Sequence, residues 1–286
     1  MAEVKIIADS CACIPAPLIA AHHIIMVPYY VHIRGATYRD LVDVQQGPFF
    51  ADLARASELP KTANPGPGDY LEAFRQAAKE APAAVSVHMT SLGSGAYQAA
   101  LVAREMAQHE LPSLQIEVVD TRNVAMCHGW IALEAARAAE RGASLPQVMD
   151  LIRRLIPRVR MIQTADTLRY LYMGGRIGRA QHLLGTLLNV KPLISMEDGG
   201  IVALGQARSR LAAYRQIVDK VAEAVGQGQF KVAYLHAAAL DEVRKLRSLL
   251  EERLNPLETI VAELSPALGV HTGPGTVGVC YLHWPD

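Results

Sequence analysis

Residues 84–107 carry the pattern that most restricts the fold, because a strand, a short loop and a helix follow one another there. Val85 and Val87 lie in an apolar run of strand length, and small or apolar residues recur at helical spacing from Ala99 onward. The loop between them is made of hydroxyl residues and glycines, namely Thr90, Ser91, Gly93, Ser94 and Gly95. A strand followed directly by a helix is the repeating unit of α/β proteins with parallel sheets.

This loop also has the composition of an anion site. Hydroxyl groups and free backbone N–H groups at the start of a helix bind carboxylates and phosphates. Ligands of parallel α/β sheets bind at the carboxyl ends of the strands, which is where the loop lies. The same residues also suit an ordinary helix N-terminus after a tight turn. Both interpretations are open on the loop alone.

The rest of residues 1–157 alternates between strand and helix patterns in the same way. Apolar runs predict strands at 4–8, 24–33 and 115–119. Helical spacing and capping residues predict helices at 18–22, 49–56, from Tyr70 onward, at 124–141 and at 145–156. A turn is expected at 35–40. The stretch 59–68, with three prolines and two glycines, is expected to be a stiff loop without regular structure.

Residues 158–286 combine a hairpin with further strand and helix units. Strands are predicted at 159–164, 190–196, 201–206, 230–236, 257–264 and 276–283. Helices are predicted after a capping Asp166 and at 180–188, 211–225 and 241–254. The Asp-Gly-Gly turn at 198–200 joins two strands as a hairpin. We therefore expect an α/β protein of two α/β domains, residues 1–157 with a mostly parallel sheet flanked by helices and residues 158–286 with a smaller mixed sheet.

Charge and cysteine content narrow the function classes. Lys and Arg total 28, as do Asp and Glu, so no basic excess exists to neutralise nucleic-acid phosphates. No apolar run is long enough to span a bilayer, and the first residues lack the basic and apolar regions of a secretory signal. Four cysteines without metal-ligand spacing fit reduced thiols. These features predict a cytoplasmic protein that binds no nucleic acid.

Several familiar motifs fail on their context. Residues 273–278 match the Gly-x-Gly-x-x-Gly spacing, but a strand follows, so a dinucleotide would meet no helix N-terminus. Ser94 lies in Gly-Ser-Gly rather than in the Gly-x-Ser-x-Gly turn of α/β-hydrolases. Phosphate-loop, zinc-protease and EF-hand patterns are absent from the sequence. No cofactor and no metal are therefore expected.

Eight short segments, in their order and spacing, match a known family. They are VKIIADS (4–10), VPYYVHIRGATYRD (27–40), PKTANPGPGDYLEAF (60–74), TSLGSGAYQAA (90–100), VVDT (118–121), DTLRYLYMGGRIG (166–178), LGTLLNVKPLI (184–194) and GVHTGPG (269–275). With them the chain resembles, over essentially its whole length, the DegV family of bacterial fatty-acid-binding proteins, which includes the carrier subunit of fatty acid kinase. The resemblance implies two α/β domains with a fatty acid held between them.

The resemblance also implies a set of site residues. Thr62, Ser94 and His271 would bind the fatty-acid carboxylate, and the acyl chain would lie in an apolar tunnel. Arg176 would lie beside the opening of the site, and Arg208 would lie where a kinase docks. Secondary candidates for ligand binding are Gly95, Ser10 and Asn64. Candidates for the tunnel wall are Ile162, Leu183, Leu187 and Leu188.

Elementary chemistry fits such a site. A carboxylate only accepts hydrogen bonds, and the hydroxyls of Thr62 and Ser94 and the imidazole of His271 can donate them. Each residue also has an ordinary interpretation, such as a turn hydroxyl bonded to its own backbone for Thr62 and a satisfied histidine in a Gly-rich turn for His271. Thr90 and Ser91 are expected to cap and shape the turn.

Three functions follow as hypotheses. The first is a carrier that holds a long-chain fatty acid and presents its carboxylate to a separate ATP-dependent kinase. The second is a carrier of another lipid or amphiphile without a kinase partner. The third is an esterase or thioesterase with Ser94 as nucleophile, His271 as base and Asp9 as the one candidate for the orienting acid. Transient membrane contact through Arg176 and Arg179 is a further hypothesis.

Overall fold

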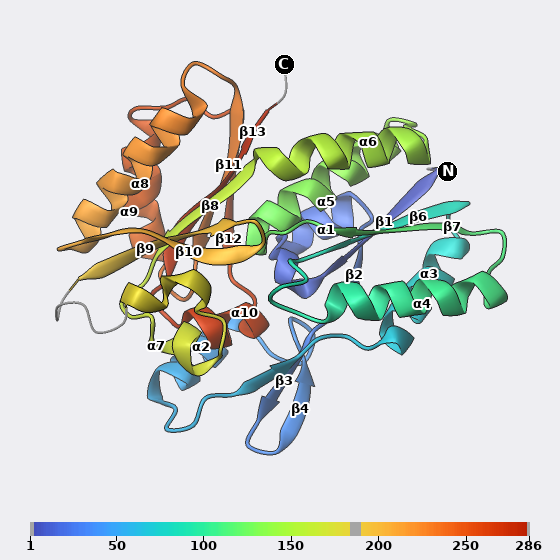
Figure 1. Cartoon of the computed structure of the whole chain (residues 1–286), viewed down its shortest axis with the longest axis horizontal. Helices are drawn as coiled ribbons and strands as arrows, with labels where there is room; N and C mark the ends of the chain where they lie inside the picture. The colour runs from blue at the N-terminus through green and yellow to red at the C-terminus, as the bar shows by residue number, and fades with distance from the viewer. Residues whose placement is uncertain (1–2, 184–189, 285–286) are drawn as a thin grey trace.

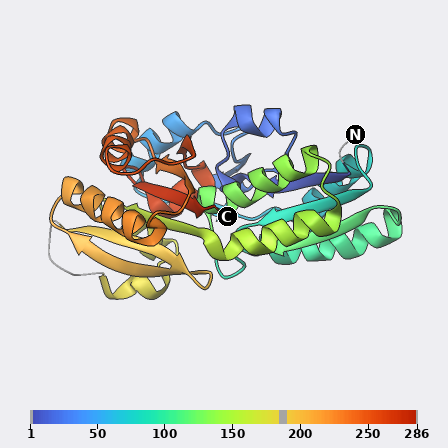
Figure 2. The same cartoon turned by 90° about the horizontal axis from the view of Figure 1, so that it is seen from above.

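The computed structural model describes residues 3–183 and 190–284, and it contains three sheets with helices around them (Figure 1). Two of the sheets lie side by side along the length of the molecule, as the view from above shows (Figure 2). We refer to residues 1–157 and 158–286 as the two halves, and the boundary between them stays a prediction. In the described part of the chain, no helix is long and apolar enough to cross a membrane.

The first sheet is wholly parallel and belongs to the first half. Its strand order is β2-β1-β6-β7, made of β1 (Val4–Asp9), β2 (Ile25–Val27), β6 (Ala83–His88) and β7 (Gln115–Asp120). The helices of this half are α1 (Ala16–Ala21), α3 (Pro67–Ala78), α4 (Ala96–Glu110), α5 (Ala125–Glu140) and α6 (Leu145–Leu155). The pair α3 and α4 covers one face, and α5 and α6 cover the other (Figure 1). The expected strand, loop and helix of residues 84–107 are thus confirmed.

The second sheet is mixed and belongs to the second half. Its order is β10-β9-β8-β13-β11-β12, made of β8 (Val159–Thr164), β9 (Lys191–Glu197), β10 (Gly200–Ala207), β11 (Phe230–His236), β12 (Glu258–Glu263) and β13 (Val277–His283). Among its described strands, β11 and β12 pair in parallel and the other neighbours pair antiparallel. On one face lie α8 (Arg210–Val225) and α9 (Leu240–Glu251). The mixed sheet is confirmed, but with six strands against four it is not the smaller one.

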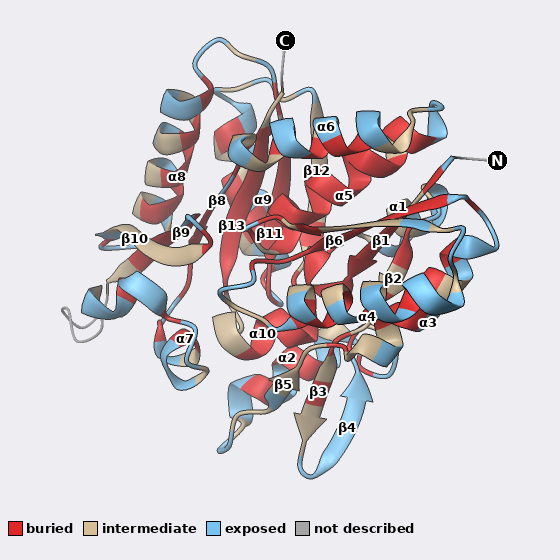
Figure 3. Ribbon diagram, turned by 45° about the vertical axis from the view of Figure 1, so that its right-hand side comes forward, coloured by how far each residue is buried: buried red, intermediate tan, exposed pale blue. Residues whose placement is uncertain are grey.

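Helix α5 lies between the parallel and the mixed sheet and is buried nearly all round, as Figure 3 shows. It packs on β1 of the first sheet and on β8 and β13 of the second. Its alanine-rich sequence allows this, because small side chains let a helix approach two sheets at once. The indole of Trp130 on this helix donates a hydrogen bond across the junction, at 3.1 Å, to the carbonyl of Cys280 in β13.

A small antiparallel sheet corrects two expectations. It has the order β4-β3-β5, with β3 (Tyr30–Ile33), β4 (Ala36–Arg39) and β5 (Lys61–Ala63), and α2 (Gln46–Arg55) follows β4 in the chain. The expected turn at 35–40 is therefore mostly strand. The expected irregular loop at 59–68 contains β5, because Pro60 and Pro65 flank the strand and leave its own N–H groups free to pair with β3.

Helical segments of the second half differ in three places. Helix α7 (Arg169–Met173) is not capped by Asp166, whose carboxylate instead pairs with Lys191 at 2.5 Å and Arg210 at 2.6 Å. The helix expected at 180–188 is a 3₁₀ helix, η3 (Gly178–Leu183), as far as the structure describes it. A helix that was not expected, α10 (Pro266–Thr272), is capped by Ser265. Two further 3₁₀ helices are η1 (Ser10–Ala12) and η2 (Ile156–Arg158).

A cluster of charged residues connects α5 of the first half with β11 and β12 of the second half. Arg137 donates hydrogen bonds of 2.7 Å to Glu134 on its own helix and to Glu258 on β12. Lys231 on β11 reaches the same two carboxylates at 2.8 Å and 3.1 Å. Only 2% of the Glu134 side chain is exposed, so its charge depends on these two cations for compensation.

Candidate functional site

A cavity of about 700 Å³ lies where the two halves meet. The first half contributes the Ser-Gly loop before α4 and strand β5, and the second contributes α7, α10, β8 and the turn between β9 and β10. Its apolar lining consists mainly of Met89, Val124, Met161, Leu171, Met196, Ile201, Leu264 and Leu268. An apolar cavity with a few polar groups is the usual form of a small-molecule site.

Thr62 and His271 meet at this cavity although they are far apart in the sequence. Thr62 lies on β5 and His271 on α10, and the threonine Oγ1 is 2.9 Å from the imidazole Nε2. Burial, followed by the positive charge of Arg176, lowers the pKa of His271 to about 4. The imidazole is therefore neutral at pH 7 and carries one N–H. Its Nε2 faces Thr62, and its Nδ1 is buried without a hydrogen-bond partner among the described residues.

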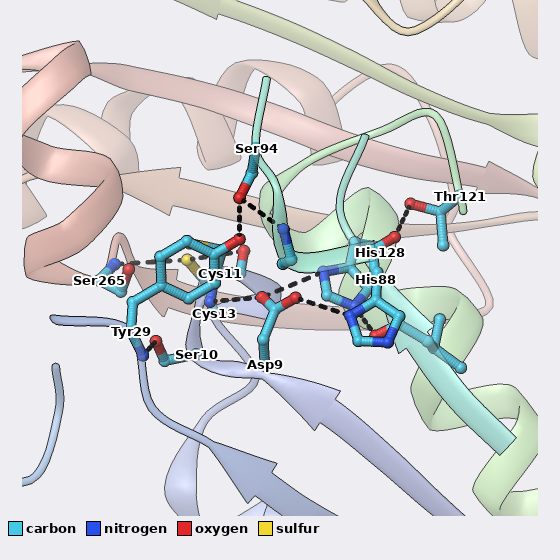
Figure 4. Close-up of polar contacts among 12 residues, drawn as sticks. Asp9, Ser10, Cys11, Cys13, Tyr29, His88, Ser94, Thr121, His128 and Ser265 are labelled. Atoms are coloured by element: carbon cyan, nitrogen blue, oxygen red, sulfur yellow. Dashed lines mark hydrogen bonds and ion pairs between the residues drawn. The ribbon is translucent and has the colours of Figure 1, made fainter. Parts of the chain in front are cut away.

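Ser94 lines the same cavity from the Ser-Gly loop. Its Oγ accepts a hydrogen bond of 3.2 Å from the N–H of Ala96 at the start of α4, as a serine at a helix start commonly does. The same oxygen lies 2.7 Å from the phenolic oxygen of Tyr29, as Figure 4 shows. Nothing in the sequence pattern indicated Tyr29, because 65 residues separate it from Ser94.

Thr90 shapes the Ser-Gly loop and also ties it to the second half. Its hydroxyl accepts a hydrogen bond of 3.3 Å from the N–H of Leu92 and donates one of 2.8 Å to the carbonyl of Gly199. Gly199 lies in the turn between β9 and β10 with φ +83, and a Cβ there would lie 2.7 Å from the Thr90 hydroxyl. The expected role of Thr90 in the turn is confirmed, and the cavity wall depends on the same residue.

The other expected site residues separate into two groups. Gly95, Asn64 and Arg176 line the cavity. Arg176 is exposed there and donates a 2.7 Å hydrogen bond to the Gly174 carbonyl. Ser10 does not line it, because its buried hydroxyl donates to Asp40 at 2.6 Å. Arg208 is exposed after β10 and is likewise not among the lining residues.

The tunnel candidates are corrected by the alternation of β8. Met161 and Gln163 line the cavity, so Ile162 points to the opposite face of the sheet, where it packs under α8 and α9. Leu183 packs with the small cluster around α7 and η3 and does not line the cavity. Leu187 and Leu188 lie outside the described residues.

Asp9 does not complete a hydrolase triad. Its buried carboxylate accepts from the N–H of Cys11 at 3.0 Å and faces the Nδ1 atoms of His88 at 3.6 Å and His128 at 3.9 Å (Figure 4). His271 instead bonds Thr62 through Nε2. The orienting role expected for Asp9 in an esterase is therefore wrong, because the acid faces two other histidines.

Metal and disulfide chemistry find no support in the described residues. No group of three or more His, Cys, Asp and Glu side chains among them could hold a metal ion. The four cysteines are buried and free, and burial raises the pKa of the Cys11 and Cys13 thiols well above the usual value. These two thiols are therefore protonated at pH 7, and Cys11 also lines the cavity.

Known proteins are similar to this chain in sequence over nearly its whole length. A family model described as "Uncharacterised protein, DegV family" matches residues 3–283. A DegV domain-containing protein of Caldanaerobacter subterraneus subsp. tengcongensis is 32% identical, over 98% of this chain and 99% of the relative. Protein DegV of Bacillus subtilis is 28% identical, over 98% of this chain and 99% of that protein.

Solved structures extend the comparison to three dimensions. A DegV family protein of Thermus thermophilus, described by its fatty acid binding, is 31% identical, has a TM-score of 0.92, and the match covers 99% of this chain and 100% of that one. A stearic acid-binding protein of Eubacterium ventriosum is 26% identical with a TM-score of 0.91, and the match covers 98% of each chain. The fold of this chain is therefore the fold of those proteins.

Proposed function

This chain belongs to the DegV family, and on that premise we propose that it binds a long-chain fatty acid in the cavity between its two halves. One observation carries the proposal: Thr62, Ser94 and His271, three residues able to donate hydrogen bonds, line one otherwise largely apolar cavity of about 700 Å³. A fatty acid has the matching form, with one acceptor-only head and an apolar tail. The fatty acid binding described for the relatives supports the same ligand class.

The tail supplies most of the affinity in this proposal. Burial of an acyl chain contributes about 0.8 kcal/mol for each methylene group, which for a long chain is on the order of 10 kcal/mol before the cost of association. Each polar contact to the carboxylate contributes much less, about 1–3 kcal/mol. The head-group residues therefore mainly set the orientation of the ligand and its preference for an acid.

A protein that holds a fatty acid by its carboxylate could present that group to a second protein and so act as a carrier. We propose that a separate ATP-dependent kinase transfers a phosphoryl group to the carboxylate oxygen, so that an acyl phosphate and ADP form while the chain itself only holds the substrate. Arg176 at the cavity and the exposed Arg208 are the residues proposed to meet that partner. The exposed Arg176 and Arg179 are also proposed for transient membrane contact. The four free thiols support a cytoplasmic location.

The direct test is to identify what the protein carries. Protein purified from cells is denatured, and the released small molecules are identified by mass spectrometry. A stoichiometric fatty acid is the expected result, and another amphiphile would favour the second carrier hypothesis. A fluorophosphonate probe distinguishes the esterase hypothesis, because labelling of Ser94 with ester turnover would contradict a purely binding role.

Removal of either hydroxyl is expected to weaken fatty acid binding without abolishing it. Ser94→Ala and Thr62→Ala should each lower the affinity by about 1–3 kcal/mol, or roughly 5- to 150-fold, because a carboxylate loses one donor while the tail stays buried. Titration calorimetry measures the change. Ser91→Ala is the matched control, since Ser91 is exposed in the same loop and bonds Asp120 through its backbone N–H. Unchanged affinity in both variants would contradict the head-group assignment.

The neutral His271 predicts a specific dependence of stability on pH. In the unfolded chain the histidine pKa returns to about 6.5, whereas burial holds it near about 4 in the folded protein. Below pH 6.5 the unfolded state therefore binds more protons, and the free energy of unfolding should fall as the pH decreases toward 4. His271→Gln removes this dependence, so the wild type should lose on the order of 2 kcal/mol relative to the variant between pH 7 and 4.5. Urea unfolding of both proteins across this pH range measures the difference. The same pH dependence of the free energy of unfolding in both would contradict the lowered pKa of His271.

A further inference from the structure

We propose that Tyr29 is a positioning residue, which orients the Ser94 hydroxyl so that its proton points to an acceptor in the cavity and thereby favours ionised fatty acids over uncharged analogues. The inference rests on the proposed function, because it concerns the same head-group site. It adds Tyr29 to the head-group residues Thr62, Ser94 and His271, and it assigns a direction to the hydrogen bonds around Ser94.

The backbone and the surroundings of Tyr29 hold its side chain in place. The residue lies between β2 and β3, and its N–H donates a 3.0 Å hydrogen bond to the buried hydroxyl of Ser10. Ser10 in turn donates to Asp40 at 2.6 Å. Only 5% of Tyr29 is exposed, and it lines the same cavity as Ser94. Its phenolic oxygen, 2.7 Å from Ser94 Oγ, therefore points to a fixed place (Figure 4).

A count of donors and acceptors gives the direction of the chain. A serine hydroxyl has one proton and two acceptor positions. At Ser94 the N–H of Ala96 occupies one acceptor position, at 3.2 Å. If Tyr29 donates to the other, the Ser94 proton is left for a third group. If Ser94 donated to Tyr29 instead, a carboxylate at Ser94 would meet no proton.

Either hydroxyl can donate in the hydrogen bond between Tyr29 and Ser94, and a ligand that only accepts selects Tyr29 as the donor. Burial, followed by the negative charge of Asp9, raises the pKa of the Tyr29 phenol well above its usual value, so the phenol keeps its proton. A carboxylate accepts only, so its arrival fixes the order as Tyr29 to Ser94 to ligand. Hydrogen bonds in such a chain polarise and strengthen one another. An alcohol both donates and accepts, so it fits either order: it accepts from Ser94 when Tyr29 donates, and it donates to Ser94 when Ser94 donates to Tyr29. Its binding therefore gains little from a fixed order.

The substitution Tyr29→Phe tests the proposal, because it removes only the phenolic oxygen. Affinities for hexadecanoic acid and hexadecan-1-ol are measured by titration calorimetry at pH 7. Tyr29→Phe should weaken acid binding about 3- to 10-fold and should change alcohol binding by less than about twofold. In a Ser94→Ala background Tyr29→Phe should have no further effect on acid binding, because Tyr29 acts through Ser94.

Tyr70→Phe is the matched control, since the Tyr70 hydroxyl is buried and has no hydrogen-bond partner among the described residues. It should leave the preference for acid over alcohol unchanged, and circular dichroism shows whether each variant is folded. Wild-type affinity of Tyr29→Phe, equal losses for acid and alcohol, or an undiminished loss in the Ser94→Ala background would each overturn the role of Tyr29. Failure of the wild type to bind either acid or alcohol would instead overturn the proposed function.

Discussion

Replacing Arg137 by methionine is expected to lower the free energy of unfolding by about 3–5 kcal/mol, the largest stability effect that we predict for this chain. Arg137 bonds both Glu134 and Glu258 at 2.7 Å. After its removal Lys231 is the one cation among the described residues that pairs with both carboxylates, and Glu134 is nearly fully buried. Methionine keeps much of the apolar stem of arginine, so the loss reports on the charge. Urea unfolding at pH 7 measures it.

Arg153→Met is the matched control for this prediction. Arg153 pairs with Asp150 at 2.9 Å on the outer face of α6, where 67% and 69% of the two side chains are exposed. An exposed pair of this kind contributes about 0–1 kcal/mol, because water screens the charges. Equal losses in the two variants would show that burial does not set the energetics of the cluster around α5.

Replacing Gly174 by alanine is expected to lower fatty acid affinity by about 2–6 kcal/mol, roughly 30- to 25,000-fold, because two head-group partners are lost instead of one. A Cβ at Gly174 would lie 2.3 Å from Nδ1 of His271, so the buried imidazole must move. Its 2.9 Å contact with Thr62 then breaks, and the head group loses two partners, at about 1–3 kcal/mol each. The backbone of Gly174 is itself compatible with alanine, since its φ is −78.

Gly68→Ala separates this effect from a general response to an added methyl group. Gly68 lies in α3, and apart from its chain neighbours and the backbone of its own helix, no atom of the described residues would lie within 4 Å of an added Cβ. Its variant should bind as the wild type does and unfold at the same or a slightly higher urea concentration. Calorimetry with the same fatty acid compares both variants. Wild-type affinity in Gly174→Ala would show that His271 does not hold the head group.

Local patterns predicted the fold class and most elements because those elements are defined by neighbours in the chain. The strand, loop and helix around Ser94 and the hairpin at 198–200 need no distant partner to be recognised. Strand β5 is different, because its three residues are a strand only through pairing with β3. The faces of β8 were also undetermined, since helices or loops cover both sides of that sheet and both Met161 and Ile162 are buried.

The site was accessible to prediction only in part. Thr62 and His271 are 209 residues apart, so their contact followed from resemblance and not from any spacing. Tyr29 was missed for the same reason, because only the fold places it against Ser94. Asp9 was given a catalytic interpretation from its residue type, whereas its surroundings of two histidines are set by α5 and β6. Convergence of distant polar groups is a property of tertiary structure.

The position of β13 has a consequence for biosynthesis. Residues 277–283 leave the ribosome after every other strand of the six-stranded sheet, yet they occupy its interior between β8 and β11. Until then the edge of β8 away from β9 stays unpaired, and Trp130 lacks the carbonyl that it bonds on Cys280. Helix α10 with His271 is translated just before β13. A nascent chain would thus expose an unpaired sheet interior, a target for chaperones, until translation has passed this strand.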